Sequence, residues 1–491
     1  MIFKLAALAF LMTATLGAQT KVVQLHSESP LVTLRVVFLT GAAADPEDKP
    51  GLASLTASML SDGGTRDMTY KQILDAMFPM ATSVSSRVDK EMTVFSATTH
   101  VDNLEAFYKL FRAMLLEPGW RSDDFQRLRD DTVNYLRVSL RGNNDEELGK
   151  EVLYNEIYAG TPYGRHDRGT VSGLQKMTVQ DLQDFYKSHY AQDNLIIGIA
   201  GGYSQAFLER MQKDFQTLPA KPYATPKWTP PAPLKGIHVT MVEKDTRSVA
   251  YSIGFPIDVR RGDPDYPALL VAQAYFGQHR DSGGRLFSRL RGQRGLNYGD
   301  YAYIEYFPNG MFRFEPEPNL GRRSQIFQIW IRPVEPPTAH FAFRAAMYEF
   351  DKLIRDGLSK EDFEQWRNFL SKNVNLLMKT KTAELGYAID SEYYGIPDYS
   401  RYVKESLAKL TVDDVNQAIR TRLQSKDIQV VVVAKGCEDL RRRLISNQIS
   451  PIQYNSPKPK EILDEDKFIQ RFKIDVVPGA IRIVPVNKIF E

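Results

Sequence analysis

The side chains that most often hold metal ions are sparse in this 491-residue sequence and poorly spaced for that chemistry. The chain contains seven histidines and one cysteine, Cys437. No two histidines stand at the spacing that would place both on one face of a helix or strand. Cys437 has no second cysteine with which to form a zinc site or a disulfide. The sequence therefore predicts a chain that binds no metal ion.

A second candidate for chemistry is the arginine-rich segment 280–294, in which five arginines accompany Gly283 and Gly284. Such a segment can bind phosphate groups or nucleic acid through its positive charge. It lacks the spacing of a phosphate-binding loop, and Phe287 is a single aromatic residue rather than a series interleaved with the arginines. The net charge of +3 gives no further reason to expect a nucleic acid as the partner.

The elements that must position these residues occur twice along the chain. The matching segments are 119–129 with 357–367, and 176–182 with 409–415. Each of the shorter segments has a threonine where a helix N-cap is expected, and each predicted helix is followed by an apolar strand. Because the matches run in the same order in both halves, the sequence predicts a duplicated unit of strands and long helices.

Hairpin-like pairs of strands, such as 82–88 with 92–98, accompany the long helices in each half. This mixture predicts an α+β fold made of two homologous units in tandem, each a mixed sheet with helices packed on one face. Prolines between residues 219 and 233 predict an extended linker. The expected organisation is an N-terminal unit at 20–218, a linker at 219–236, a C-terminal unit at 237–450, and an extension at 451–491 with a strand at 481–486.

The first 18 residues have the pattern of an export signal. Lys4 is followed by an apolar run at 5–16 and by the small residues Gly17 and Ala18. The run is shorter than the ~20 apolar residues that span a bilayer, and no later segment has a transmembrane pattern. We therefore expect a signal peptide at 1–18 and a periplasmic or secreted protein without a membrane span.

Two motifs carry a resemblance to a known family. The segment 51–65 reads GLASLTASMLSDGGT, and the segment 285–303 contains SRLRGQRGLNY. Together with the duplication, they resemble the insulinase/pitrilysin family of peptidases, which includes mitochondrial processing peptidase. The first motif of that family is G-L-A-H-x-x-E-H-M-L-x-x-G-T, with the inverted zinc motif H-x-x-E-H. The resemblance covers nearly all of the chain after residue 18 and implies the family's processing-peptidase-like fold.

The resemblance also implies that the zinc site is lost. The family's two histidines correspond to Ser54 and Ser58, and its catalytic glutamate corresponds to Ala57. These three positions lie on one face of a predicted helix. Serine hydroxyls are poor zinc ligands, and Ala57 cannot accept a proton. The family's third ligand, a glutamate, corresponds to a position near Asn134 or Tyr135, and residues 132–144 include no acidic side chain. The chain is therefore expected to be a non-catalytic member that holds no zinc.

Arg291 and Tyr298 match an arginine and a tyrosine that the family places in its second half, where the pair contacts the substrate carbonyl. A donor aimed at an oxygen that gains charge is typically worth ~3 kcal/mol at the transition state. The plainer interpretation is a solvated helix-end charge and an ordinary strand aromatic. The resemblance favours a heterodimer in which this chain lends Arg291 and Tyr298 to a zinc-bearing homologue that hydrolyses peptides, with the zinc held by the partner.

Two alternatives remain from the sequence. One is a homodimeric pseudoenzyme that binds peptides or acts as a scaffold without proteolysis. The other is an enzyme that uses Ser54 or Ser58 as a nucleophile, although neither serine has a histidine nearby in the sequence to act as its base.

Overall fold

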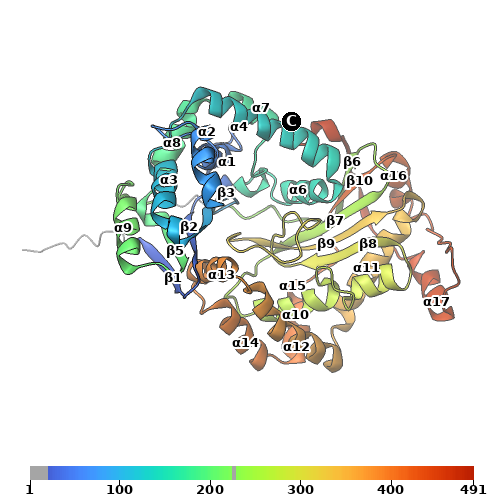
Figure 1. Ribbon diagram of the computed structural model, residues 1–491. Coiled ribbons are helices and arrows are strands. Elements are labelled where there is room, and N and C mark those ends of the chain that lie inside the picture. The colour runs from blue at the N-terminus through green and yellow to red at the C-terminus, as the bar shows by residue number, and fades with distance from the viewer. Residues whose placement is uncertain (1–19, 224–227) are drawn as a thin grey trace, which may run out of the picture.

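The computed structural model describes residues 20–223 and 228–491, so the predicted export signal at 1–18 lies outside the described residues. Two mixed sheets, each with its own layer of helices, form two domains that pack against each other (Figure 1). The predicted α+β class and the tandem arrangement of two similar units are confirmed. No helix in the described ranges is long and apolar enough to cross a membrane.

The N-terminal domain is built from five strands and a set of helices that cover them. The strands are β1 (Lys21–His26), β2 (Leu31–Phe38), β3 (Val84–Val88), β4 (Thr93–His100) and β5 (Leu195–Gly201). The helices are α1 (Leu52–Ser61), α2 (Tyr70–Met77), α3 (Leu104–Leu116), α4 (Ser122–Asn134), the π-helix η4 (Tyr135–Leu140), α5 (Arg141–Asn143), α6 (Asp145–Ile157), α7 (Val171–Lys176), α8 (Val179–His189) and α9 (Gln205–Phe215).

The C-terminal domain repeats this plan and adds one strand. Its strands are β6 (Ile237–Glu243), β7 (Val249–Ile257), β8 (Asn297–Tyr303), β9 (Gln325–Val334), β10 (Gln429–Ala434) and β11 (Val476–Pro485). Its helices are α10 (Tyr266–Gly277), the π-helix η7 (Phe287–Gly292), α11 (Ala339–Asp356), α12 (Lys360–Leu377), α13 (Lys381–Tyr394), α14 (Tyr399–Lys409), α15 (Val412–Arg422), α16 (Cys437–Ile445) and α17 (Lys460–Ile469).

The two sheets have the same topology, which confirms the duplication. The strand order is β1-β5-β2-β4-β3 in the first sheet and β6-β10-β7-β9-β8 in the second, where β11 adds to the outer edge of β6. In both sheets the first pair is parallel and the next three pairs are antiparallel. The predicted hairpin of 82–88 with 92–98 is the antiparallel pair β3 and β4.

The repeated threonine motifs start equivalent helices, as the sequence predicts. Thr178 caps α8 and Thr411 caps α15, and each threonine forms a reciprocal capping box with an aspartate three residues later, Asp181 or Asp414. Each helix leads into an interior strand of its sheet, β5 or β10, in which every residue is buried. Equivalent local signals therefore produce equivalent elements in the two domains.

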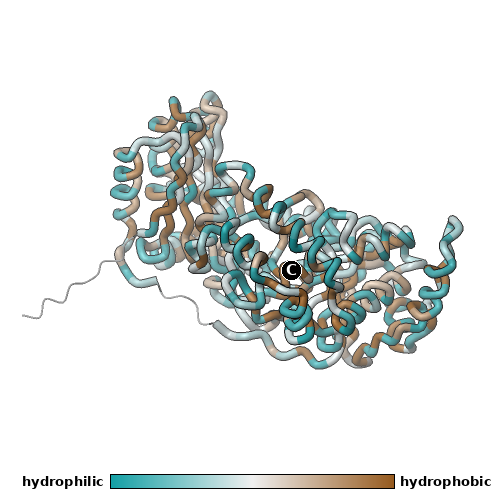
Figure 2. Tube along the Cα trace, turned by 90° about the horizontal axis from the view of Figure 1, so that it is seen from below, coloured by the Kyte–Doolittle hydropathy of each residue, from teal (hydrophilic) through white to brown (hydrophobic). Residues whose placement is uncertain are grey.

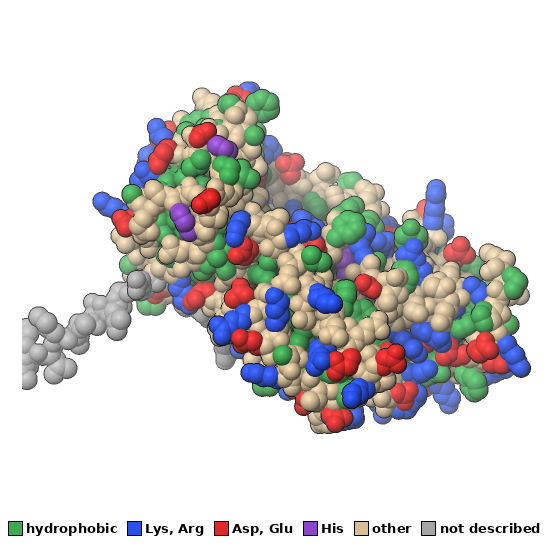
Figure 3. Space-filling view, turned by 60° about the horizontal axis from the view of Figure 1, so that its bottom comes forward, with side chains coloured by type: hydrophobic (Ala, Val, Ile, Leu, Met, Phe, Trp, Pro, Cys, Tyr) green, Lys and Arg blue, Asp and Glu red, His purple; other side chains and the backbone are tan. Residues whose placement is uncertain are grey.

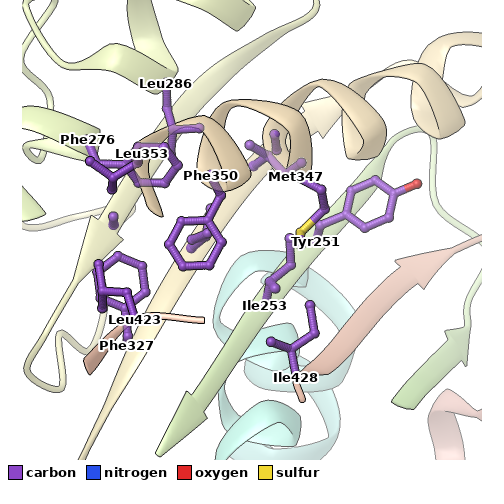
Figure 4. Packing of buried hydrophobic residues seen from close by; sticks show 14 of the residues in the cluster. Tyr251, Ile253, Phe276, Leu286, Phe327, Met347, Phe350, Leu353, Leu423 and Ile428 are labelled. Atoms are coloured by element: carbon purple, nitrogen blue, oxygen red, sulfur yellow. The ribbon is translucent and has the colours of Figure 1, made fainter. Parts of the chain in front are cut away.

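Each domain has its own apolar core between its sheet and its helices. In the C-terminal domain, Tyr251 and Ile253 of β7 face Met347, Phe350 and Leu353 of α11, a packing that Figure 4 shows in close-up. All of these side chains are at most 3% exposed. Figure 2 shows hydrophobic stretches inside both domains and an alternation of hydrophobic and hydrophilic residues along the helices.

The structure differs from the prediction of helices on one sheet face only. Each domain also places a helix on the other domain's sheet: α6 lies on β7 and β10, and α13 lies on β5 and β1. Glycines permit the close approach. A Cβ at Gly149 of α6 would lie 2.9 Å from the Ser252 hydroxyl, and a Cβ at Gly198 of β5 would lie 2.7 Å from Ile389 of α13. The second sheet face is buried only when both domains are present, which a local pattern cannot reveal.

The extension after residue 450 contacts both domains. Its helix α17 packs against α11, and its strand β11 pairs in parallel with β6, in the region of the predicted strand at 481–486. The last residues then reach the N-terminal domain, where Phe490 and Glu491 accept backbone hydrogen bonds from Val171 and Ser172.

Candidate functional site

Helix α1 carries the three positions at which the family motif predicts zinc chemistry. Ser54 and Ser58 are partly exposed on this helix, whereas Ala57 between them is completely buried. Asp45 fixes the start of α1 by accepting hydrogen bonds from the backbone amides of Gly51 and Ala53, at 2.6 and 2.8 Å. The helix of the motif is thus preserved, but the side chains at positions 54, 57 and 58 supply neither an imidazole nor a carboxylate.

The position of the missing third ligand lies where α4 passes into the π-helix η4. Asn134 is exposed at the end of α4, and Tyr135 begins η4. The Arg168 guanidinium lies over the Tyr135 ring at 4.2 Å from its centroid. Burial raises the pKa of Tyr135 to about 12, so its hydroxyl stays neutral. A neutral phenol and an amide do not suit Zn²⁺, so this face of the domain does not fit the metal.

The rest of the described chain shows no replacement metal site. Within residues 20–223 and 228–491, no group of three or more histidine, cysteine, aspartate or glutamate side chains could hold a metal ion. His166 is buried next to Glu151, and burial lowers its pKa to about 3. Cys437 is buried, and burial raises the pKa of its thiol to about 12, which makes it a poor ligand and nucleophile.

The serine-nucleophile alternative finds no support in the geometry. A nucleophilic serine needs a base within hydrogen-bonding distance of its hydroxyl. In the described residues, neither Ser54 nor Ser58 has a side-chain hydrogen bond to a histidine or a carboxylate. His166 instead accepts a hydrogen bond from the Arg168 amide through Nδ1, at 3.0 Å.

Most arginines of the segment 280–294 are used inside the protein. Arg285 and Arg289 both bind Glu349, each at 2.9 Å. Arg294 is buried and binds Asp466 and Glu465 of α17, at 2.8 and 2.6 Å. Arginines neutralised in this way present little charge to a phosphate group. The face of the C-terminal domain shown in Figure 3 likewise carries acidic and basic side chains side by side.

Among the described residues, the Arg280 guanidinium has backbone oxygens as its hydrogen-bond acceptors and one ring contact. Its guanidinium donates to the carbonyl oxygen of Met311 at 2.6 Å and lies over the Phe314 ring at 4.3 Å from the centroid. Arg280 therefore joins the end of α10 to the loop between β8 and β9.

Arg291 differs from the three arginines that bind carboxylates. In the described part of the chain, no carboxylate lies within ion-pairing distance of its guanidinium. Its Nη1 donates to the backbone oxygen of Tyr298 at 3.0 Å, and the guanidinium lies over the Tyr298 ring at 4.1 Å from the centroid. Tyr298 is 69% exposed at the start of the edge strand β8. The structure thus brings together an exposed tyrosine and a partly buried arginine whose charge no carboxylate among the described residues neutralises.

A buried carboxyl lies two residues beyond the tyrosine. Asp300 is fully buried in β8 and accepts a hydrogen bond from the Asn297 side chain. Burial raises the pKa of Asp300 to about 8, although the Asn297 hydrogen bond and the Arg291 charge both oppose this rise. Near neutral pH Asp300 is therefore mainly protonated and does not neutralise Arg291.

The contribution of α17 to this site was not predicted from the sequence. Glu465 and Asp466 hold Arg289 and Arg294, the neighbours of Arg291 in and beside η7. These partners are about 170 residues apart in the chain, and no sequence pattern joins them. In the sequence, Glu465 and Asp466 have the pattern of an ordinary solvated helix surface. Their contact with the π-helix η7 exists only in the folded chain.

The degenerate helix and the arginine–tyrosine pair lie in different domains of the chain. Ser54, Ala57 and Ser58 belong to the N-terminal domain, whereas Arg291 and Tyr298 belong to the C-terminal domain. In the described residues no hydrogen bond or ion pair joins the two groups.

Comparison with known proteins gives two family models that together match most of the chain. The model described as Insulinase (Peptidase family M16) matches residues 21–171, and the Peptidase M16 inactive domain matches residues 176–370. The "Non-peptidase homolog YmxG" of Helicobacter pylori is 21% identical over 436 residues, which cover 86% of this chain and 94% of that protein. The "Uncharacterized zinc protease YmxG" of Bacillus subtilis is 22% identical over 357 residues, or 72% of this chain and 81% of that protein.

Solved structures share the fold. A Pseudomonas fluorescens peptidase M16 inactive domain superposes with a TM-score of 0.74 at 21% identity, covering 85% of this chain and 96% of that one. A chain of complex III2 from Candida albicans superposes with a TM-score of 0.66 at 14% identity, covering 84% and 93%. The family models, the duplicated topology and the preserved frame of α1 agree. The chain belongs to the insulinase family of M16 peptidases, as a member with Ser54, Ala57 and Ser58 at the positions of the zinc motif.

Proposed function

We propose that this protein is a non-catalytic subunit of an insulinase-type metallopeptidase, in which it binds peptide for a zinc site held by a homologous partner chain. The observation that carries the proposal is the contact between the partly buried Arg291 and the exposed Tyr298, where no carboxylate among the described residues neutralises the positive charge. An unpaired guanidinium beside a phenol suits a peptide carbonyl oxygen that gains negative charge during hydrolysis.

The N-terminal domain of this chain lacks the zinc-binding side chains, whereas the C-terminal domain keeps the arginine and the tyrosine. The proposed roles of the two subunits follow from this difference. The face of α1 offers Ser54, Ala57 and Ser58, which cannot bind zinc or activate water. The zinc, which polarises the scissile carbonyl and its attacking water, would therefore be supplied by the partner. Arg291 and Tyr298 would hold the same carbonyl from the opposite side, and the substrate would be an unfolded peptide.

The proposed location is the periplasm or the exterior of the cell. It rests on the export pattern of residues 1–18, with Lys4 before an apolar run. A partner would have to share that compartment, so a zinc-bearing homologue with its own export signal is the expected companion.

The first experiment identifies that companion. The tagged protein would be purified gently from the envelope of its own cells, and any stoichiometric companion would be identified by mass spectrometry. We expect a chain of similar size with an intact H-x-x-E-H motif. Recovery of the protein alone, or only as a homodimer, would overturn the lent-residue mechanism.

The second experiment tests the pair itself in the assembled complex. Arg291→Ala is expected to lower the kcat of peptide hydrolysis about 100-fold, the loss typical of one oxyanion donor. Tyr298→Phe, which keeps the ring and removes the hydroxyl, should lower it by a similar order. Arg420→Ala is the matched control, because Arg420 is an exposed arginine on α15 whose one side-chain hydrogen bond among the described residues is to Gln417. Assembly, measured by size-exclusion chromatography, should be unchanged in all three variants.

The second candidate function is a homodimeric pseudoenzyme that binds peptides or acts as a scaffold. The name of the Helicobacter pylori relative and the fold shared with a chain of complex III2 favour it. The two functions predict different assemblies: a homodimer here and a heterodimer in the first proposal. They also predict different activities, because the pseudoenzyme has no peptidase activity in any assembly that the chain forms.

A further inference from the structure

The C-terminal domain contains a cavity of about 100 Å³. Helices α10, α12, α13 and α14 form one side of it, and the loop between β8 and β9 forms the other. Neither Arg291 nor Tyr298 lines this cavity. The peptidase role proposed above therefore does not account for it.

One wall of the cavity is an apolar stripe of α12. Leu370, Val374 and Leu377 line it, at a spacing of four and then three residues that places their side chains on one helical face. Leu270 of α10 and Val403 of α14 also line the cavity. These side chains offer water no hydrogen-bond partner, so the wall favours a hydrophobic occupant.

Polar side chains in the lining are already paired within the protein. The Glu305 carboxylate accepts hydrogen bonds from Nε and Nη2 of Arg261, at 2.8 and 3.0 Å. The Gln273 amide donates to the backbone oxygen of Ala302 at 2.7 Å. Because the Glu305 charge is compensated by Arg261, the cavity does not require a charged occupant.

Two amide side chains of the lining are different. Gln278 directly follows α10, and Asn373 lies on α12 between Leu370 and Leu377. Both residues are only partly buried, and neither side chain forms a hydrogen bond with any other described residue. Each amide offers both a donor and an acceptor, as does a peptide group. The two amides can therefore bind the N–H and C=O groups of a peptide backbone.

The volume of the cavity limits the side chain that it can hold. An apolar cavity of about 150 Å³ accepts a benzene ring. A cavity of about 100 Å³ is smaller, so it suits the branched aliphatic side chain of leucine, isoleucine or valine better than an aromatic ring.

We propose that this cavity is a subsite that binds a branched aliphatic side chain of an extended peptide, while Gln278 and Asn373 bind the backbone of that peptide. The inference rests on the proposed peptide-binding function and specifies its substrate class. Peptides with leucine, isoleucine or valine at the position that reaches the cavity are bound more tightly than peptides with a polar residue there.

Titration of the full-length chain with a capped amino acid tests the subsite. N-acetyl-leucine methylamide would be added to protein with isotope-labelled leucine and valine methyl groups, observed by NMR. We expect saturable shifts of the Leu370, Val374 and Leu377 methyl signals with a Kd of about 1 mM, as for a ligand of this size. The capped serine derivative should bind about tenfold more weakly, because it lacks the apolar contact. Unshifted methyl signals at about 20 mM capped leucine would overturn the proposal.

Two neighbouring leucines of α12 provide a matched pair of variants. Leu377→Trp places a larger side chain in the cavity and should weaken the binding of capped leucine more than about tenfold. Leu376→Trp is the control, because Leu376 is 58% exposed and does not line the cavity, so binding should not change. Circular dichroism checks that both variants are folded. An equal effect of the two substitutions would contradict the subsite.

The contribution of the amides is tested with Asn373→Ala and with isobutanol, which carries the apolar group of leucine without a peptide group. Asn373→Ala should weaken the binding of capped leucine about fivefold, the effect of one hydrogen bond, and should leave isobutanol binding unchanged. If isobutanol binds as tightly as capped leucine and Asn373→Ala has no effect, the cavity accepts small apolar molecules only and the peptide subsite is refuted.

These titrations need neither a partner chain nor peptide hydrolysis. Failure of capped leucine to bind would overturn the subsite alone. The lent-residue mechanism would still be decided by the identity of the companion chain and by the kinetics of the Arg291→Ala complex.

Discussion

Ala57 shows at the scale of one residue how the zinc site was lost without loss of the fold. Its methyl group is completely buried in a helix whose frame, from Gly51 to Leu60, still follows the family motif. Because Ala57 is completely buried, a carboxylate side chain at this position would have to displace its neighbours. Catalytic chemistry has therefore been replaced by packing at the position where the resemblance places the general base.

This packing predicts the cost of restoring the motif. Ala57→Glu should lower the free energy of unfolding by about 2 kcal/mol or more, because the new side chain overpacks the core and carries an unpaired charge. Ser54→Glu introduces the same side chain one turn away at a partly exposed position, and should cost less than about 1 kcal/mol. Urea unfolding of both variants measures the difference. Equal costs would mean that position 57 has not been repacked.

At the scale of elements, the position of Arg291 depends on a helix from the end of the chain. The π-helix η7 carries Arg291, and α17 binds the arginines on either side of it through Glu465 and Asp466. The Arg294 side chain is inaccessible to solvent, so its partners in α17 compensate a buried charge. Equivalent capped helices could be located from the repeated threonine motifs, because a cap is a local signal. The pairing of α17 with η7 joins segments far apart in the sequence, so only the tertiary structure could locate it.

The pairing predicts a large effect of a small substitution. Asp466→Asn should lower the free energy of unfolding by about 3 kcal/mol, because it leaves the buried Arg294 without a full counter-charge. Asp464→Asn on the same helix removes an exposed ion pair with Lys467 and should cost less than about 0.5 kcal/mol. Thermal unfolding compares the two variants, and a similar loss in both would argue against the buried pair.

At the scale of the whole molecule, the two domains stabilise each other. Helices α6 and α13 each cover the sheet of the opposite domain, and the last residues of the chain, which pack in the N-terminal core after β11, add a third crossing. Arg322 of the C-terminal domain is buried against Asp89 of the N-terminal domain and lies over the Tyr306 ring. Neither domain can bury its second sheet face or satisfy these charges alone.

This mutual burial predicts a single cooperative unfolding transition for the full chain. Differential scanning calorimetry should give equal calorimetric and van't Hoff enthalpies, as for a two-state protein. Two resolved transitions would show that the domains are energetically independent. Each domain expressed alone should lack a cooperative transition, because one face of its sheet would be exposed to water.

The sequence by itself determined the fold class, the duplication and the absence of zinc-binding side chains on α1, because each is written in local patterns or in residue identity. Threonine caps, apolar strands and the substitutions at 54, 57 and 58 need no partner to be recognised. Only the tertiary structure decided which arginine of the segment 280–294 is left without a carboxylate and where the end of the chain binds. Those outcomes depend on side chains far apart in sequence, such as Arg294 with Asp466 and Arg141 with Glu491, and such pairs leave no local pattern.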